Sequence, residues 1–472
     1  MVFSSLIFTF FFLPIVLLMY YLAKEEYRNY ILLIASLWFY SYGEPHFIVV
    51  MIASIMVNYG LALLVDKYKT KCIGKLCLIL DLAGNLGILF VYKYFDYLLY
   101  IMAEKIHLGV SPIGITLPIG ISFFTFQALS YVIDVYRGTV KVQKNPLYLA
   151  LYISFFPQLI AGPIVRYSTI ERQITERKSS TDLFADGVRR FMLGFGKKVL
   201  LANNLALIPQ QTFSRDVTIT NPLFLWMGSV AYSLQIFYDF SGYSDMAIGL
   251  GKMFGFEFEE NFNYPYISKT VTEFWRRWHI SLGQWFKDYV YIPLGGAKTN
   301  AIRHILNMLV VWTLTGIWHG ANITFWAWGF GYFVLLVIEK YLVKPSHHEN
   351  VYFRIFWRII TLVCVNFGWV IFNSESLKAG VKYCLAMLGY YRYQTNMIDT
   401  DIVANFRQYG VFIIMGILFS TPIMKMLREK ILSEGGKKLF AILEPVVVSV
   451  VFLWAVSYLI LGAHNPFIYF NF

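Results

Sequence analysis

Long apolar runs dominate the chain, and each run of about 20 residues can cross the hydrocarbon core of a bilayer as a helix. The 472 residues are 58% hydrophobic and only 14% charged, which excludes an ordinary soluble domain. We therefore predict an all-α, polytopic integral membrane protein with about 11–13 spans. The candidate runs lie near residues 3–22, 29–43, 46–65, 76–100, 115–134, 191–208, 222–250, 305–320, 321–339, 355–372, 409–427 and 440–461.

Lysine and arginine concentrate in four connecting segments, residues 66–75, 137–145, 166–190 and 425–438. Such basic loops stay on the cytoplasmic side, so all four are predicted to be cytoplasmic. With residues 3–22 read as a retained first helix, both termini then fall outside the cytoplasm. The formal net charge of +12 is explained by these loops, and no nucleic-acid partner is expected.

Two segments interrupt the pattern of simple spans. Residues 146–165 are apolar, but both flanks are predicted to be cytoplasmic, and Pro157 and Gly162 break a helix, so we expect a re-entrant segment. Residues 256–304 are too polar to cross lipid, yet their tryptophans, tyrosines and arginines suit an interfacial platform on the cytoplasmic side. We see no repeat and no linker, so we expect one domain over residues 1–472.

The first candidate site is the stretch "GIWHGAN", in which His319 follows Trp318 and precedes Gly320 and Asn322. An ionisable group inside an apolar span is costly and is usually kept for function. A packed histidine bonded to backbone carbonyls is the alternative. A neutral imidazole suits a general base acting on a hydroxyl, with Trp318 and Asn322 lining the substrate site.

The second candidate site is "EFWRRWHISL", where Arg276, Arg277 and His279 lie within one helical turn. A basic helix at the headgroup boundary would explain the arginines by itself. Guanidinium groups also match phosphate geometry, so Arg276 and Arg277 are candidates for holding phosphates or a carrier. His279 is the second candidate catalytic residue.

A third group of polar residues lies within the apolar run 222–250. Asp239 and Asp245 need partners or water at membrane depth, and they either line a substrate path or belong to a structural network. The sequence contains no phosphate-binding loop, zinc-protease or serine-hydrolase motif, and its cysteines lack metal spacing. We expect no metal site and no tightly bound cofactor.

Several blocks resemble the membrane-bound O-acyltransferase family, and specifically its alginate O-acetylation branch. They include "LPIGISFFTFQALSYVIDVYRG", "LYISFFPQLIAGPIVRY", "NFNYPYISKTVTEFWRRWHISLGQWF", "LTGIWHGANITFWAWG" and the closing "PFIYFNF". The resemblance covers nearly the full chain with the blocks in the same order. The related D-alanyl transfer proteins of teichoic acid synthesis share the central blocks.

The resemblance implies an enzyme with a bundle of spans around a central tunnel, which transfers an acyl group across the cell membrane. His319 and His279 match the family's two histidines. The implied donor is acetyl-CoA or a carrier-bound thioester on the cytoplasmic side. The implied acceptor is an extracellular polysaccharide, reached through an extracytoplasmic SGNH-type, esterase-like partner.

Three other functions remain open from the sequence. D-alanyl transfer to teichoic acid is the nearest. A transporter or flippase also has broken helices and polar residues at the midplane, although such proteins often carry matched halves, which are not seen here. A scaffold for a wall-modifying complex would leave both histidines structural.

Overall fold

The computed structural model describes residues 2–345, 348–391, 400–433, 435–462, 465 and 468. Every regular element within these residues is helical, which confirms the predicted all-α class. The chain forms two compact units, residues 1–191 with 243–259 and residues 192–242 with 260–472. The single domain predicted over residues 1–472 stays a prediction. The closing "PFIYFNF" block lies outside the described residues except for Ile468, and so do both termini.

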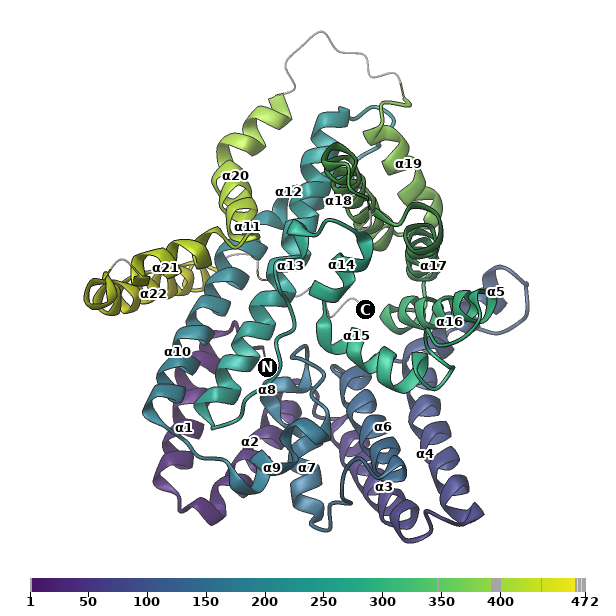
Figure 1. Cartoon of the computed structure of the whole chain (residues 1–472), viewed down its shortest axis with the longest axis vertical. Coiled ribbons are helices and arrows are strands. Elements are labelled where there is room, and N and C mark those ends of the chain that lie inside the picture. Colours follow the sequence, from purple (N-terminus) through teal and green to yellow (C-terminus); the bar gives the residue numbers. More distant parts are fainter. Residues whose placement is uncertain are drawn as a thin grey trace. The chain divides into compact units, whose positions relative to one another are not determined.

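The first unit contains short helices between longer ones (Figure 1). Two helices, α10 and α13, begin in one unit and end in the other. The elements of this unit are η1 (Phe8–Phe12), α1 (Leu13–Leu22), α2 (Glu25–Gly43), α3 (Ile48–Lys67), α4 (Cys72–Phe90), η2 (Val91–Phe95), α5 (Asp96–Glu104), α6 (Ile121–Arg137), α7 (Pro146–Ser154), α8 (Phe156–Leu159), α9 (Tyr167–Glu176) and the first part of α10 (Thr181–Gly196).

Helices α3, α4 and α6 pack against one another in this unit (Figure 1). The bounds of α6 follow from two glycines, because Gly120 before it and Gly138 after it have φ of 77° and 78°, a region that favours glycine. Between α3 and α4, the buried amides of Asn58 and Asn85 donate to each other's side-chain oxygens at 3.2 and 3.0 Å. The pair satisfies polar groups that would otherwise be costly at membrane depth.

The segment 146–165, predicted to be re-entrant, forms two short helices that are separated at Phe155. Asn145 caps α7 by accepting the backbone N–H of Leu147 at 3.0 Å, and α8 has only four residues. The irregular backbone is covered by protein, since Ser154 and Gln158 have no exposed side chain. Irregular backbone at membrane depth requires such cover. Whether both flanks are cytoplasmic stays a prediction.

The second unit contains the longest helices and the segment predicted as a platform. Residues 256–300 form short helices joined by loops, and none of them is long enough to cross a bilayer. The last four residues of the predicted platform, 301–304, already belong to the helix Ala301–His319, which is long and apolar enough to cross. The elements of this unit are η3 (Lys197–Ala202), α11 (Asn203–Leu205), α12 (Leu207–Phe213), the first part of α13 (Pro222–Met253), η4 (Pro265–Ile267), α14 (Val271–Arg277), α15 (Ile280–Phe286), η5 (Lys287–Tyr291), α16 (Ala301–His319), α17 (Ile323–Val337), η6 (Ile338–Val343), α18 (Val351–Asn373), α19 (Leu377–Met387), α20 (Thr400–Phe419), α21 (Ile423–Ser433) and α22 (Lys437–Ile460).

Eight helices in the described part of the chain are long and apolar enough to cross a membrane. This confirms a polytopic protein with fewer clear spans than the 11–13 predicted. Some predicted runs form helices that are short, such as α6 with 17 residues, or carry charged residues, such as α13 with Asp239 and Asp245. The eight are Ile48–Lys67, Cys72–Glu104, Thr181–Phe213, Ala301–His319, Ile323–Val343, Val351–Asn373, Thr400–Phe419 and Lys437–Ile460.

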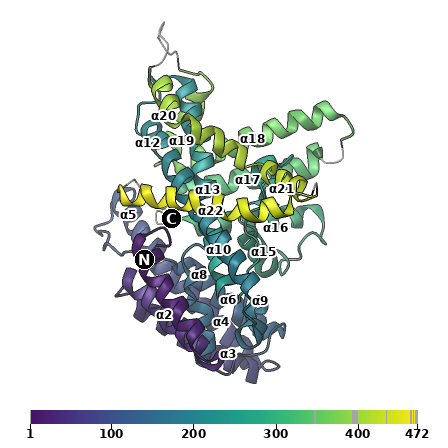
Figure 2. The ribbon, with the colours of Figure 1, turned by 90° about the vertical axis from the view of Figure 1, so that its left-hand side faces the viewer.

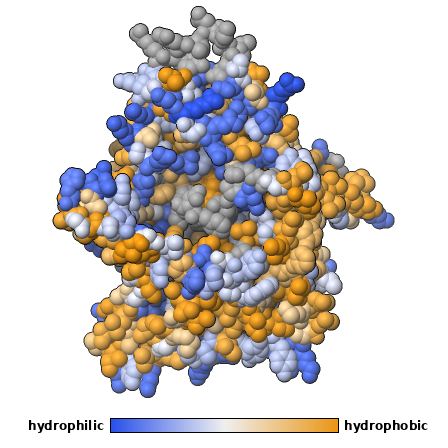
Figure 3. Space-filling view, turned by 180° about the vertical axis from the view of Figure 1, so that it is seen from behind, coloured by the Kyte–Doolittle hydropathy of each residue, from blue (hydrophilic) through white to orange (hydrophobic). Residues whose placement is uncertain are grey.

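The outer surfaces of these helices are apolar, as helices facing lipid require. In the most apolar window of α22 only 17% of residues are buried, and Val450 and Leu453 are more than half exposed. Figure 2 shows α22 along its length, and Figure 3 shows hydrophobic residues over much of the visible surface. In a soluble protein an exposed apolar surface of this extent would cause aggregation.

Candidate active site

His319 is the last residue of α16, at a sharp turn into α17. Asn322 ends the turn as the N-cap of α17: its side-chain oxygen accepts the N–H of Thr324 at 3.2 Å, and its amide donates to the Glu375 carbonyl at 3.0 Å. Both ends of the Asn322 amide therefore hold the turn in place. Its predicted role in substrate binding stays a prediction.

Two glycines bring α16 and α17 close together beneath this turn. A Cβ atom on Gly316 would lie 2.5 Å from the carbonyl oxygen of Phe325, and one on Gly329 would lie 2.4 Å from that of Trp312. Any larger residue would push the two backbones apart. Gly316 thus packs against the backbone of the neighbouring helix.

The His319 ring lies in an aromatic enclosure built from three helices. Its centroid is 5.0 Å from Trp318 on α16, 5.1 Å from Trp328 on α17 and 5.2 Å from Phe372 on α18, with interplanar angles of 80–82°. Edge-on contacts of this kind are favourable and fix the orientation of a ring. Only 8% of His319 is exposed, so a group that reacts with it does so largely out of bulk water.

His279 lies between α14 and α15, and its backbone has φ 44° and ψ 54°. This left-handed conformation is costly for a residue with a side chain and is often found at functional sites. The side chain is 2% exposed, and the Phe240 ring contacts it at 4.6 Å. Burial lowers the pKa of His279 from 6.5 to about 3, which keeps the imidazole neutral.

Asn261 determines which nitrogen of His279 carries the proton. The side-chain oxygen of Asn261 accepts the backbone N–H of Ser281 at 3.2 Å and its hydroxyl at 2.9 Å, so this oxygen is an acceptor. It lies 3.1 Å from Nδ1 of His279, which must therefore donate. The remaining nitrogen, Nε2, is then the acceptor of the ring, as a base or hydrogen-bond acceptor requires.

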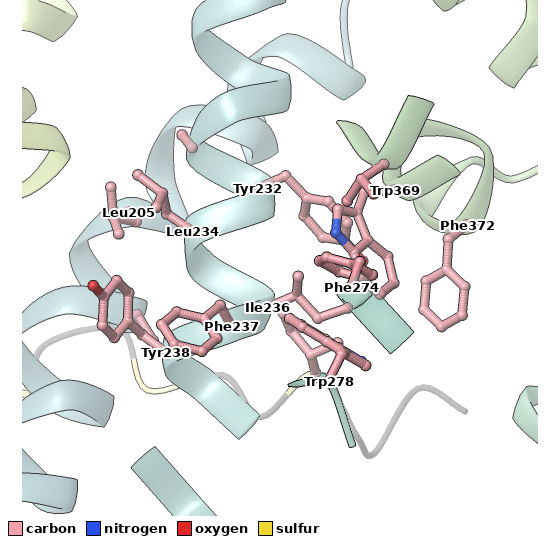
Figure 4. Close-up of a cluster of buried hydrophobic side chains, with 14 of the residues drawn as sticks. Leu205, Tyr232, Leu234, Ile236, Phe237, Tyr238, Phe274, Trp278, Trp369 and Phe372 are labelled. Carbon is pink, nitrogen blue, oxygen red and sulfur yellow. The ribbon is translucent and has the colours of Figure 1, made fainter. Parts of the chain in front are cut away.

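The two predicted histidines, 40 positions apart in sequence, meet at one side chain. The indole of Trp318 lies 5.0 Å from the His319 ring and 6.0 Å from the His279 ring. Behind them is a large aromatic core, in which Phe274 stacks on Trp278 at 5.6 Å and Trp278 lies 4.8 Å from Trp369. Figure 4 shows these three side chains together on one side of α13. Such packing leaves little freedom to move the histidines apart.

The two predicted phosphate-binding arginines have different surroundings. Arg277 pairs with Glu273 at 2.9 Å and donates to the carbonyl of Asn263 at 3.0 Å. Arg276 is exposed and lines a cavity of about 710 Å³. The geometry therefore supports a ligand contact for Arg276 and a structural contact for Arg277.

The two predicted aspartates of α13 fall into different units. Asp239 is buried in an ion pair with Lys198 and also accepts the N–H of Ile468 at 2.8 Å. Asp245 pairs with Arg190 at 2.8 Å. Each carboxylate has the partner that burial demands, which favours the structural interpretation. Asp239 directly precedes Phe240, whose ring contacts His279, so the ion pair anchors the helix turn beside the site.

Glu339 is a residue that sequence reasoning missed. It is 3% exposed in η6, and its oxygens accept the N–H groups of Val271 at 2.6 Å and Thr272 at 2.8 Å, the Thr272 hydroxyl at 2.8 Å and the Trp357 indole at 2.9 Å. One carboxylate thereby holds the start of α14 against α17 and α18. The only sequence signal was an acidic residue near the end of an apolar run.

Replacing Glu339 with glutamine should destabilise the protein, because the amide removes one acceptor and the charge that strengthens all four bonds. We expect a loss of about 2–4 kcal/mol. Thermal unfolding of the purified protein measures it, with Glu349→Gln in an exposed loop as the control. An unchanged unfolding midpoint for Glu339→Gln would show that the carboxylate does not hold α14.

The model of the membrane-bound O-acyltransferase family matches residues 34–377. The chain is 41% identical over 405 residues to a probable alginate O-acetylase of Pseudomonas aeruginosa, covering 84% of this chain and 77% of the relative. It is 32% identical over 425 residues to a peptidoglycan O-acetyltransferase of Helicobacter pylori, covering 82% and 80%.

A more distant relative is a teichoic acid D-alanyltransferase of Bacillus subtilis, 30% identical over 280 residues, which cover 54% of this chain and 69% of the relative. The relatives named for acetyl transfer match a larger share of this chain than the one named for D-alanyl transfer. The family match includes the turn at His319 and the segment at His279. The chain therefore belongs to the membrane-bound O-acyltransferase family and is a multi-pass membrane O-acyltransferase.

Proposed function

We propose that this protein transfers an acetyl group from a cytoplasmic thioester to the outside of the cell, where an extracellular polysaccharide becomes O-acetylated. The observation that carries the proposal is the meeting of His319 and His279 at Trp318, in a chain whose relatives include O-acetylases. Two buried imidazoles beside one indole suit acyl transfer to a hydroxyl, because a neutral imidazole can take the proton of the hydroxyl.

His319 acts as the general base. It takes the proton of the acceptor hydroxyl while the hydroxyl oxygen bonds to the acyl carbon. The carbon–sulfur bond of the thioester then breaks, and the leaving thiolate receives the proton. His279, held neutral with Nδ1 donating to Asn261, offers Nε2 as a hydrogen-bond acceptor. We assign the donor side to His279, which lies between the two short helices of the platform, and the acceptor side to His319, which lies at the turn between α16 and α17.

The orientation follows from the basic segments. If residues 66–75, 137–145, 166–190 and 425–438 are cytoplasmic, the platform with Arg276 and His279 faces the donor, and both termini lie outside. The acceptor side, at His319, then faces away from the cytoplasm. There an SGNH-type partner would receive the acetyl group and complete its transfer to the polymer.

D-alanyl transfer to teichoic acid is the second candidate, supported by the Bacillus subtilis relative. Acetyl transfer is favoured because the acetylases match a larger share of this chain. Transport and scaffolding have no observation of their own in their favour.

Deleting the gene should remove alkali-labile acetate from the cell's surface polysaccharide, and a plasmid copy should restore it. Acetate and D-alanine released by mild alkali are measured from the same samples. Loss of D-alanine with unchanged acetate would replace the proposal with D-alanyl transfer. Unchanged release of both compounds would exclude both functions.

A further inference from the structure

We propose that two side chains of α17, the indole N–H of Trp328 and the hydroxyl of Thr324, bind the acyl oxygen while it carries negative charge during the transfer. The proposal rests on the proposed function and adds two catalytic residues to it. Thr324 and Trp328 are buried, with 1% and 3% exposed. Because they are four positions apart in α17, they lie one turn apart on the same face of the helix.

Both groups are hydrogen-bond donors that lack an acceptor. Within the described residues, neither Nε1 of Trp328 nor Oγ1 of Thr324 has a hydrogen-bond partner. By contrast, the indole of Trp226 donates to the carbonyl of Met387 at 2.9 Å. A buried donor without an acceptor costs free energy in the folded protein. Such donors at a reaction centre are explained by an acceptor that is present only during the reaction.

The turn at His319 takes away the acceptor that Thr324 would otherwise have. A threonine in a helix can donate to the carbonyl four residues back, as Thr315 of α16 does to Val311 at 2.8 Å. For Thr324 that residue is Gly320, which lies before α17 in an extended conformation, with φ 176° and ψ 169°. Its carbonyl is therefore not in the helical position. The turn that ends α16 at His319 thus leaves the hydroxyl of Thr324 unpaired.

Trp328 lies directly against the proposed general base. Its ring is 5.1 Å from the ring of His319, and the two planes are nearly perpendicular. Of the other two rings around His319, Phe372 has no donor, and Trp318 lies between His319 and His279. A base that takes the proton of the acceptor hydroxyl must be close to the bond that forms, so the acyl oxygen lies near His319 as well.

The two donors act on the charge that appears when the new bond forms. As the hydroxyl oxygen bonds to the acyl carbon, an electron pair of the carbonyl moves onto the acyl oxygen, which becomes an oxyanion. The oxyanion accepts the N–H of Trp328 and the O–H of Thr324. The electron pair then returns, the carbon–sulfur bond breaks, and the thiolate receives the proton from His319. Donors that are already fixed stabilise this charge without reorganisation of solvent.

Replacing Thr324 with valine tests the hydroxyl, since valine keeps the shape of the side chain. We expect the initial rate of acetate incorporation into the surface polymer to fall about 10²-fold or more at matched folded protein. The midpoint of thermal unfolding should stay the same or rise, because an unpaired buried hydroxyl is removed. Thr324→Ser keeps the hydroxyl and should restore most of the rate.

The matched control is Thr361→Val in α18. Thr361 is 1% exposed, and its hydroxyl also has no partner among the described residues. It lies 11 positions before Phe372, about 16 Å along the helix. The control should transfer acetate at the wild-type rate. A wild-type rate for Thr324→Val would overturn the proposal and would mean that buried water satisfies the hydroxyl. A loss that Thr324→Ser does not restore would also overturn it, in favour of packing.

Replacing Trp328 tests the indole N–H. Trp328→Phe removes this donor but also leaves a cavity, so the second variant carries benzothienylalanine, in which sulfur takes the place of the N–H group. We expect both variants to lose about 10²–10³-fold in rate. Trp326→Phe, at a position of α17 that is 39% exposed, is the control and should keep the wild-type rate. A wild-type rate with benzothienylalanine would overturn the proposal, because Trp328 would then act by packing alone.

The same cells separate failure of the two donors from failure of the proposed function. Every variant is expressed in a strain that lacks the chromosomal gene, beside the wild-type copy in a parallel culture. If the wild-type copy restores no acetate, the proposed function fails, and the role of Thr324 and Trp328 fails with it. If the wild-type copy and the variants without the donors restore acetate at the same rate, only the role of the two donors fails.

Discussion

Replacing His319 with alanine is expected to lower acetyl transfer by about 10²–10⁴-fold, the contribution typical of a general base. Two rings of the enclosure, Trp328 and Phe372, would stay in place, because each also packs on Trp369 of the aromatic core. Expression and membrane insertion should stay near normal. Alkali-released acetate from the surface polymer measures the activity, and detergent-solubilised yield measures the folded protein.

The matched control is His348→Ala, which removes an imidazole from an exposed loop position and should leave acetate at the wild-type level. Normal acetate in the His319 variant would rule out the base and would favour a scaffold or a transporter. A large loss of folded protein would instead show that His319 is mainly a packing residue. Its small exposure of 8% makes this a real alternative, and the yield measurement decides it.

Replacing His279 with glycine or with alanine should reduce acetyl transfer by about 10²-fold in both cases, yet the two variants should differ in stability. At φ 44° an alanine keeps the strain of the left-handed region, whereas a glycine does not. We expect the glycine variant to be the more stable by about 1–2 kcal/mol, measured by thermal unfolding. Equal stabilities would mean that the backbone relaxes away from this conformation.

We also expect His279 to make the stability of the protein depend on pH. Because burial lowers the pKa of His279 from 6.5 to about 3, the unfolded chain binds a proton more readily than the folded protein between these values. The contribution of the neutral His279 to the free energy of unfolding is therefore fully present above about pH 6.5, and it is lost as the pH falls toward 3. His279→Gly should weaken this acid destabilisation, and an unchanged pH profile would contradict the burial of a neutral imidazole.

The sequence by itself predicted those features that depend only on residues close together along the chain. Apolar runs must become helices in lipid, so the all-α class and most helix positions followed from hydropathy. The turn at His319 lies where two candidate runs, 305–320 and 321–339, meet, and the structure ends α16 at His319 and begins α17 at Ile323. A resemblance carried by "WRRWH" and "WHG" identified the two histidines, because those blocks are contiguous in sequence.

Only the tertiary structure showed which side chains meet across helices, because this depends on the face that each helix turns toward its neighbours. Arg276 and Arg277 are adjacent in sequence, yet one faces a cavity and the other an ion pair, because successive residues of a helix point in different directions. The meeting of His279 and His319 at Trp318 likewise needs the packing of separate segments. Glu339 acquires its role only when the chain brings η6 to α14. No spacing in the sequence encodes those contacts, since each depends on distances between segments that are remote along the chain.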